Sequence, residues 1–150
     1  VAEDGAVVAV RGADGAYRVA GARGHAFEVE MWLRADGDTR PVSALAAAAA
    51  RCDRLGCVVE GGPAAGLVAL GLNSAAFADD CRLAAVVVSR FAAPPGCAGV
   101  AVDRAALARG GAHALYLVEG SPAGAPAFRI ETAYPAVRRP FMPPPGAGAQ

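Results

Sequence analysis

The chain of 150 residues carries 14 basic and 14 acidic residues, so its formal net charge is zero, and 55% of its residues are hydrophobic. This length suffices for one compact domain around a single core. The zero charge argues against strong direct nucleic-acid binding by this chain, because such binding needs a basic excess that holds the phosphate backbone against salt. No apolar run reaches the roughly 18 residues of a membrane span, so none is predicted.

Residue usage and the chain ends speak about source rather than mechanism. All fourteen basic residues are arginine, and alanine, glycine and proline are frequent, which is typical of a GC-rich bacterial genome. The chain begins at Val1 without methionine, and neither end shows a charged region followed by an apolar signal region. We therefore expect the chain to be a piece of a longer protein.

The N-terminal stretch predicts a β-hairpin followed by a helix. Two apolar runs, near residues 6–11 and 16–20, flank Gly-Ala-Asp-Gly, which supplies the positive-φ positions of a tight turn. The next segment, HAFEVEMWLRADGD, spaces its apolar residues as a short amphipathic helix that ends before Asp36. The apolar side of this helix is expected to contain Phe27, Met31, Leu33 and Trp32.

The middle of the chain predicts a second hairpin and a second helix. The alanine-rich segment VSALAAAAAR is either helical or a loose linker. After Cys57, the segment CVVEGGPAAGLVALGL places two apolar runs around a Gly/Pro turn, as a hairpin does. Asn73 and Ser74 then cap a helix through SAAFADDCRL, with Phe77 and Cys81 one turn apart on its apolar side.

The last third predicts strands around one short helix. The β-branched run AAVVVSRF is typical of a strand buried on both faces, and GVAVD forms a further strand. The helix RAALARGG stops at its two glycines, and HALYLVE with AFRIETAY forms a closing hairpin. We expect residues 1–137 to form a single globular domain and residues 138–150 to be a proline-rich tail.

This order of elements predicts an α+β fold, with a mixed, mostly antiparallel sheet and helices packed on one of its faces. No internal repeat is visible. Glycine-rich phosphate-binding loops are absent as well, because the scattered glycines fall in turns without the strand-loop-helix context that such loops need.

Residues for hydrolytic chemistry are scarce. Metal-dependent hydrolases cluster histidines and carboxylates, whereas this chain has only His25, in an expected loop, and His113, at the start of an expected strand. Both are interpreted as structural, His25 at the surface and His113 half-buried. No serine lies in a GxSxG elbow, so no catalytic residue is predicted.

The four cysteines allow several interpretations. The favoured one is two structural disulfides, Cys52 with Cys57 and Cys81 with Cys97, which require an oxidising compartment such as the bacterial periplasm. A four-cysteine zinc site is allowed, although the spacings lack CxxC pairs. Redox catalysis is disfavoured because Cys81 is near the C-terminus of its helix, where a thiolate is destabilised. Buried free thiols remain an alternative.

Nearly the whole chain, up to Phe141, resembles a known protein family. The segments that carry the likeness are VAVRGADG (8–15), EMWLRADGD (30–38), RCDRLGCV (51–58), AFADDC (76–81), VVVSRFAAPPGC (86–97) and VDRAALARGGAHALY (102–116). They resemble the soluble C-terminal region of ComEC-family competence proteins, the inner-membrane channels for DNA uptake, in their alphaproteobacterial form.

In better-known members of that family, this region is a metallo-β-lactamase-like domain proposed to degrade the non-transported DNA strand. The resemblance therefore implies a reduced metallo-β-lactamase-like fold. The family's His-x-His-x-Asp-His loop should fall before residue 51, where this chain has GHAFEVEMWLRADGD. The strand that leads to a His-His-Gly turn in the family reads VVVSRFAAPPG here. The resemblance thus implies the fold without the nuclease.

The expected function is a non-catalytic accessory domain of a membrane DNA-uptake channel, stabilised by its cysteine pairs and without a cofactor. Its expected partner is the transmembrane portion of the same polypeptide, with DNA reached through the wider channel. The domain is expected at the inner membrane, facing the periplasm. The alternative is a residual metal-dependent nuclease or phosphoesterase that uses the cysteines, or His25 and His113, to bind zinc. A small periplasmic protein-binding domain is a third interpretation.

Overall fold

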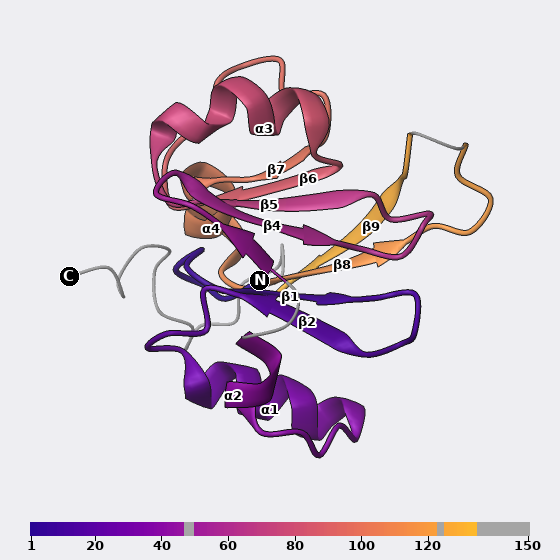
Figure 1. The fold of residues 1–150 in the computed structure, drawn as a ribbon. Coiled ribbons are helices and arrows are strands. Elements are labelled where there is room, and N and C mark those ends of the chain that lie inside the picture. Colours follow the sequence, from indigo (N-terminus) through magenta and orange to yellow (C-terminus); the bar gives the residue numbers. More distant parts are fainter. Residues whose placement is uncertain (47–49, 123–124, 135–150) are drawn as a thin grey trace.

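The computed structural model describes residues 1–46, 50–122 and 125–134 of the chain. The tail expected at residues 138–150 therefore lies outside the described residues. Within these ranges, nine β-strands and four α-helices alternate along the chain (Figure 1). Four of the six strand pairs are antiparallel and two are parallel. The prediction of a mostly antiparallel α+β protein is confirmed.

The N-terminal hairpin forms as its turn residues predict. Strand β1 (Val8–Arg11) pairs antiparallel with strand β2 (Tyr17–Ala20). Gly15 has a φ of 77° in the connecting turn, and its N–H donates to the Gly12 carbonyl over 3.0 Å. A side chain would strain the backbone at that φ, which accounts for the glycine.

Two helices pack on one face of this hairpin. Helix α1 (Ala26–Asp36) ends one residue later than expected, because Gly37 caps it with a left-handed φ of 73°. Helix α2 (Val42–Ala46) follows, so the alanine-rich segment begins as a helix. The predicted apolar side of α1 is partly wrong: Val29 and Leu33 are buried, whereas Phe27 is 73% and Met31 47% exposed.

The largest sheet has five strands in the order β3 (Ala50–Cys52), β4 (Gly56–Glu60), β5 (Leu67–Gly71), β6 (Val86–Ser89) and β7 (Val100–Val102). The pairs β3–β4 and β4–β5 are antiparallel, and the pairs β5–β6 and β6–β7 are parallel. All four residues of β6 are buried, as predicted for a strand covered on both faces. Strand β3 was not expected, since it falls in the alanine-rich segment.

Helix α3 (Phe77–Leu83) covers the outer face of the five-stranded sheet, after a 3₁₀ turn over Ser74–Ala76. The Asn73 side chain accepts from the Ala75 N–H over 2.9 Å and so starts the turn as predicted. Phe77 and Cys81 are buried and belong to the apolar cluster that joins α3 to the sheet. Helix α4 (Arg104–Gly110) follows β7 and ends at Gly111.

Strand β8 (His113–Leu117) and strand β9 (Phe128–Thr132) form a second antiparallel hairpin. The strands therefore make three sheets, and the expectation of one sheet with helices on one face is wrong. The inner face of the five-stranded sheet packs on β1, β2 and the β8–β9 hairpin, and α1 and α2 lie beyond β1 and β2 (Figure 1). Helix α3 on one side and helices α1 and α2 on the other thus lie outside two β layers, because both faces of the N-terminal hairpin carry apolar residues that need a cover, whereas Leu107 of α4 belongs to the inner core.

Candidate functional site: an apolar groove between two hairpins

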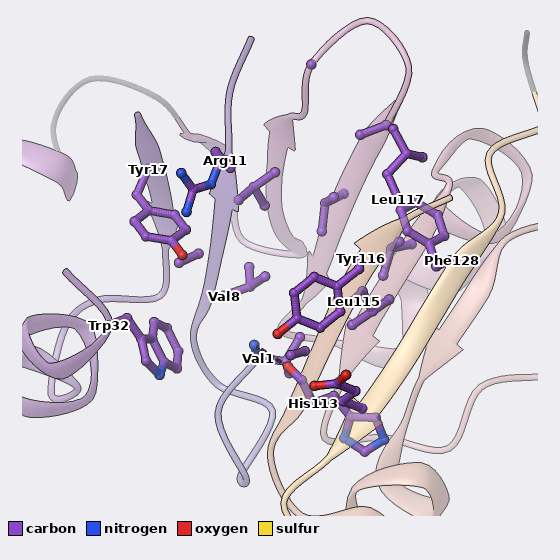
Figure 2. Close-up of a pocket in the computed structure, with 18 of the residues that line it drawn as sticks. Val1, Val8, Arg11, Tyr17, Trp32, His113, Leu115, Tyr116, Leu117 and Phe128 are labelled. Atoms are coloured by element: carbon purple, nitrogen blue, oxygen red, sulfur yellow. Dashed lines mark hydrogen bonds between the residues drawn. The ribbon is translucent and has the colours of Figure 1, made fainter. Parts of the chain in front are cut away.

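A groove with a volume of about 840 Å³ separates β1 from β8 and β9 (Figure 2). Apolar side chains from both hairpins line it, among them Val8, Val10, Leu115, Leu117 and Phe128. Polar and aromatic groups stand around them, including Arg11, Tyr17, Trp32, Tyr116 and His113. Concave apolar surfaces of this size with few polar groups are typical of binding sites, so the groove is the leading candidate.

Cation–π contacts hold two of the aromatic rings on opposite sides of the groove. The Arg11 guanidinium lies 5.1 Å from the centre of the Tyr17 ring on the β1–β2 side. On the other side, the Arg129 guanidinium lies 4.5 Å from the centre of the Tyr116 ring. Arg11 also forms an ion pair with Asp36 at the end of α1, and this pairing raises the pKa of Arg11. Each arginine therefore has local partners, since Arg129 also forms an ion pair with Glu131 on the same strand.

Strand β1 presents an open backbone edge to the groove. The Gly12 N–H donates to the Ala16 carbonyl over 2.9 Å, and hydrogen-bonded pairs alternate along an antiparallel ladder. Val8 and Val10 therefore bond to β2, while the backbone groups of Ala9 and Arg11 point away from β2. Ala9 and Arg11 both line the groove. Among the described residues, no backbone hydrogen bond meets these outward groups.

Strand β8 presents a matching open edge. The Val118 N–H donates to the Ala127 carbonyl over 2.9 Å, and the Ala133 N–H to the Ala112 carbonyl over 2.9 Å. By the same alternation, the backbone groups of His113, Leu115 and Leu117 point away from β9. Those of His113 are bonded, whereas those of Leu115 and Leu117 have no backbone partner in the described ranges.

The residues at the start of the chain close one end of the groove. The Val1 nitrogen donates to the His113 carbonyl over 2.9 Å, and the His113 N–H donates to the Val1 carbonyl over 3.1 Å. On the other side, the Ala2 N–H donates to the Val7 carbonyl over 3.1 Å. Val1 and Ala2 thus bridge the two hairpins. Burial lowers the pKa of the Val1 amino group from 8.0 to about 6.

The two histidines lie apart in different structural roles. His113 begins β8 as predicted, but it is buried rather than half-buried, and its Nδ1 lies 2.7 Å from the Gly111 carbonyl oxygen. His25 stands at the N-terminus of α1, with Nε2 3.5 Å from Asp4 and Nδ1 3.9 Å from Glu28. The His25 ring is largely covered, with 18% of its side chain exposed.

The cysteines pair as the sequence predicts. Cys52 and Cys57 lie opposite each other on β3 and β4 at disulfide distance, with their Cα atoms 4.0 Å apart. Cys81 of α3 pairs with Cys97, with their Cα atoms 4.4 Å apart. Cys57 belongs to the inner core cluster and Cys81 to the cluster under α3, so the two pairs occupy opposite faces of the five-stranded sheet. A disulfide sulfur has no thiolate to offer a metal.

A smaller pocket of about 320 Å³ lies beside the Cys52–Cys57 pair and is lined by Asp53, Asp79 and Asp80. Burial, together with the charges of Asp79 and Asp53, raises the pKa of Asp80. The Leu55 and Gly56 N–H groups donate to Asp53 over 2.7 and 3.0 Å and lower its pKa, so Asp53 belongs to the β3–β4 turn.

In the residues that the structure places, no three histidine, cysteine or acidic side chains come together as a metal site would require. No helix found in those residues combines the length and apolar character needed to cross a membrane.

The groove was not anticipated from the sequence. Its two edges come from hairpins almost a hundred residues apart, and its closed end depends on a contact between Val1 and His113, which are 112 positions apart. The only local signal was the alternating pattern of HALYLVE, which predicted a strand but not a free edge.

No family model matches the chain, and neither a curated protein nor a solved structure matches it.

Proposed function

We propose that this chain is a non-catalytic accessory domain of a membrane DNA-uptake channel, stabilised by its two cysteine pairs. Its partner is the transmembrane portion of the same polypeptide, and the domain faces the periplasm from the inner membrane. DNA is handled by the wider channel, because the domain itself has a formal net charge of zero. The reduced metallo-β-lactamase-like fold implied by the sequence resemblance is part of this proposal.

The observation that carries the proposal is the use made of the two segments where the family has its metal ligands. The first segment, GHAFEVEMWLRADGD, forms α1, and its Val29 and Leu33 pack against the N-terminal hairpin. The second, VVVSRFAAPPG, forms the buried strand β6 and the loop that leads to Cys97. Both segments contribute to packing in this chain, and this use supports the proposal of a non-catalytic domain.

The cysteine pairs support the proposed compartment. Disulfides form and persist in the periplasm and are rare in the reducing bacterial cytosol. The Cys52–Cys57 pair joins β3 to β4, and the Cys81–Cys97 pair joins α3 to the loop before β7. Mass spectrometry of protein recovered from the periplasm without reductant should give a mass four hydrogens below that of the all-thiol chain. Four alkylatable thiols in that material would contradict the periplasmic placement.

The experiment that tests the function is a deletion in the source bacterium. Removing the codons of this domain should lower natural transformation, whereas His25→Gln should leave it unchanged because the domain is proposed to have no catalytic imidazole. In the same gene, the coding sequence before the codon of Val1 should encode a segment with several membrane helices. A short open reading frame without such a segment would contradict the proposal, as would unchanged transformation after the deletion.

The alternative, a residual metal-dependent nuclease, is tested on the same protein. Purified chain should be analysed for zinc and manganese by mass spectrometry and incubated with single-stranded DNA. Stoichiometric metal together with cleavage that His25→Gln abolishes would replace the accessory-domain proposal.

A further inference from the structure

We propose that the groove is the slot for a missing β-strand, and that its occupant is the polypeptide segment directly preceding Val1 in the full-length protein. With that strand in place, β2, β1, the added strand, β8 and β9 become one five-stranded antiparallel sheet. The source of the strand rests on the proposed function, in which a membrane portion precedes this domain.

The β8 side fixes the register of the added strand. Val1 and His113 exchange both of their backbone hydrogen bonds, which makes them a bonded pair of an antiparallel ladder. Continuing this ladder places the second residue before Val1 opposite Leu115 and the fourth opposite Leu117. These are the residues of β8 whose outward backbone groups have no partner among the described residues.

The β1 side gives the same register independently. The Ala2 N–H donates to the Val7 carbonyl over 3.1 Å, and the Ala2 carbonyl accepts from the Gly5 N–H over 3.1 Å, so both backbone groups of Ala2 point toward the chain that leads into β1. Extending the antiparallel pairing from the Ala2–Val7 hydrogen bond places the first residue before Val1 opposite Ala9 and the third opposite Arg11. Ala9 and Arg11 are the residues of β1 whose backbone groups point into the groove.

The edges of β8 and β1 would form hydrogen bonds with different residues of the added strand. The edge of β8 bonds to the second and fourth residues before Val1, and the edge of β1 bonds to the first and third. In a central antiparallel strand, successive residues bond to opposite neighbours, so one strand of about four residues satisfies both edges without conflict. The agreement of two independent registers is the strongest support for this occupant.

The side chains at the closed end show what the occupant must be made of. Val1 packs against the inner core cluster, whereas Ala2 belongs to the cluster between the N-terminal hairpin and α1. Successive side chains of the added strand would continue this alternation, with the first residue before Val1 on the α1 side and the second on the inner core side. Both sides are apolar near Val1, so the occupant is an apolar, extended segment buried on both faces.

The test extends the 150-residue chain by four residues, Thr-Thr-Val-Val, placed directly before Val1. Amide hydrogen exchange measured by NMR should slow at Leu115 and Leu117 on β8, and at Ala9 and Arg11 on β1, by about tenfold or more. The matched control is Thr-Thr-Pro-Val, which places proline opposite Leu115 and so removes the N–H that its carbonyl would accept. Protection in the control should be largely lost.

Three outcomes would overturn the proposal. One is unchanged exchange at these amides in the extended chain. Another is equal protection with the proline control, which would indicate a general stabilisation instead of a ladder. The third is a dimer of the unextended chain with the same amides protected, since a second copy would then be the occupant. A gene with no membrane-encoding upstream segment would remove the proposed source of the strand, yet it would leave the exchange result intact.

Discussion

The five-stranded sheet and the pair of hairpins lie against the same inner core, but one is complete and the other is split. In the five-stranded sheet, consecutive strands are hydrogen-bonded without a break from β3 to β7, and both faces of the central strands are covered. In the described part of the chain, the backbone hydrogen bonds of Val1 and Ala2 join the β1–β2 and β8–β9 hairpins at one end, and a groove opens between them. The comparison teaches that core burial and backbone pairing are separable: the hairpins share the core without sharing a ladder.

The largest expected effect on the free energy of unfolding comes from removing a core side chain of the five-stranded sheet. Leu70 in β5 is fully buried in the inner core, whereas Leu115 in β8 is half-buried at the groove. Leu70→Ala should lower the free energy of unfolding by about 3–5 kcal/mol, because it leaves a cavity that close-packed strands cannot fill. Leu115→Ala should lower it by about 1 kcal/mol, since the groove already exposes one side of that residue. Equal losses in urea unfolding would contradict the contrast between the two regions.

Removing the disulfides should destabilise the five-stranded sheet, because each disulfide limits the conformational freedom of the unfolded chain. Replacing Cys81 and Cys97 together by serine should cost about 3 kcal/mol, and replacing Cys52 and Cys57 together about 2 kcal/mol, because the first pair closes the longer loop. Urea unfolding should be followed by circular dichroism and by the fluorescence of Trp32, the single tryptophan, which lies on the hairpin side. Coincident curves are expected for a two-state domain. A larger loss for the Cys52–Cys57 pair would contradict the loop-length argument.

The bridge between the hairpins should make the stability of the 150-residue chain depend on pH. Burial lowers the pKa of the Val1 amino group to about 6 from 8.0, so the unfolded chain binds more protons between these values. The free energy of unfolding should therefore rise from pH 6 to pH 8 by about 2 kcal/mol at most, and the same amount should be lost when the pH is lowered from 8 to 6.

The control for this prediction is the same chain acetylated at Val1, which has no amino group to titrate. His25 and His113 are present in both forms, so the difference between the two pH profiles isolates Val1. Identical profiles would show that the amino group is not buried between the hairpins in solution.

The elements of the fold were predictable where the signal is local. Glycine at Gly15 and Gly37 marks a turn and a helix end because a positive φ is required at each position. The cysteine pairing was predictable for a similar reason, since Cys52 and Cys57 flank a four-residue turn that brings two strands together.

The face of α1 could not be predicted from spacing alone. Phe27 with Met31 and Val29 with Leu33 are both apolar pairs one helical turn apart, and they lie on different sides of the helix. Which pair is buried depends on how the helix meets the hairpin, and the structure buries Val29 and Leu33. The groove escaped prediction in the same way, because a pattern of alternating residues predicts a strand but does not say whether both of its edges are paired.

The smallest expected effect concerns Asp103, which lies between β7 of the five-stranded sheet and α4. Asp103 accepts from the Ala106 N–H over 2.9 Å at the start of α4 and from the Ala93 N–H over 3.0 Å. Its burial opposes ionisation, but these backbone donors outweigh burial and lower the pKa of Asp103. The contribution of the carboxylate is therefore present at neutral pH and is lost as the pH falls below the ordinary value of 3.8.

Asp103→Ala should lower the free energy of unfolding by about 1–2 kcal/mol, and Asp103→Asn by less, because asparagine keeps an acceptor for the helix start. Amide exchange at Leu115 and Leu117 should stay unchanged in both variants, since Asp103 does not reach the groove. If protection from exchange were also lost at those amides, the two β layers would open together. That result would contradict the inference that core burial and backbone pairing are independent in the two regions.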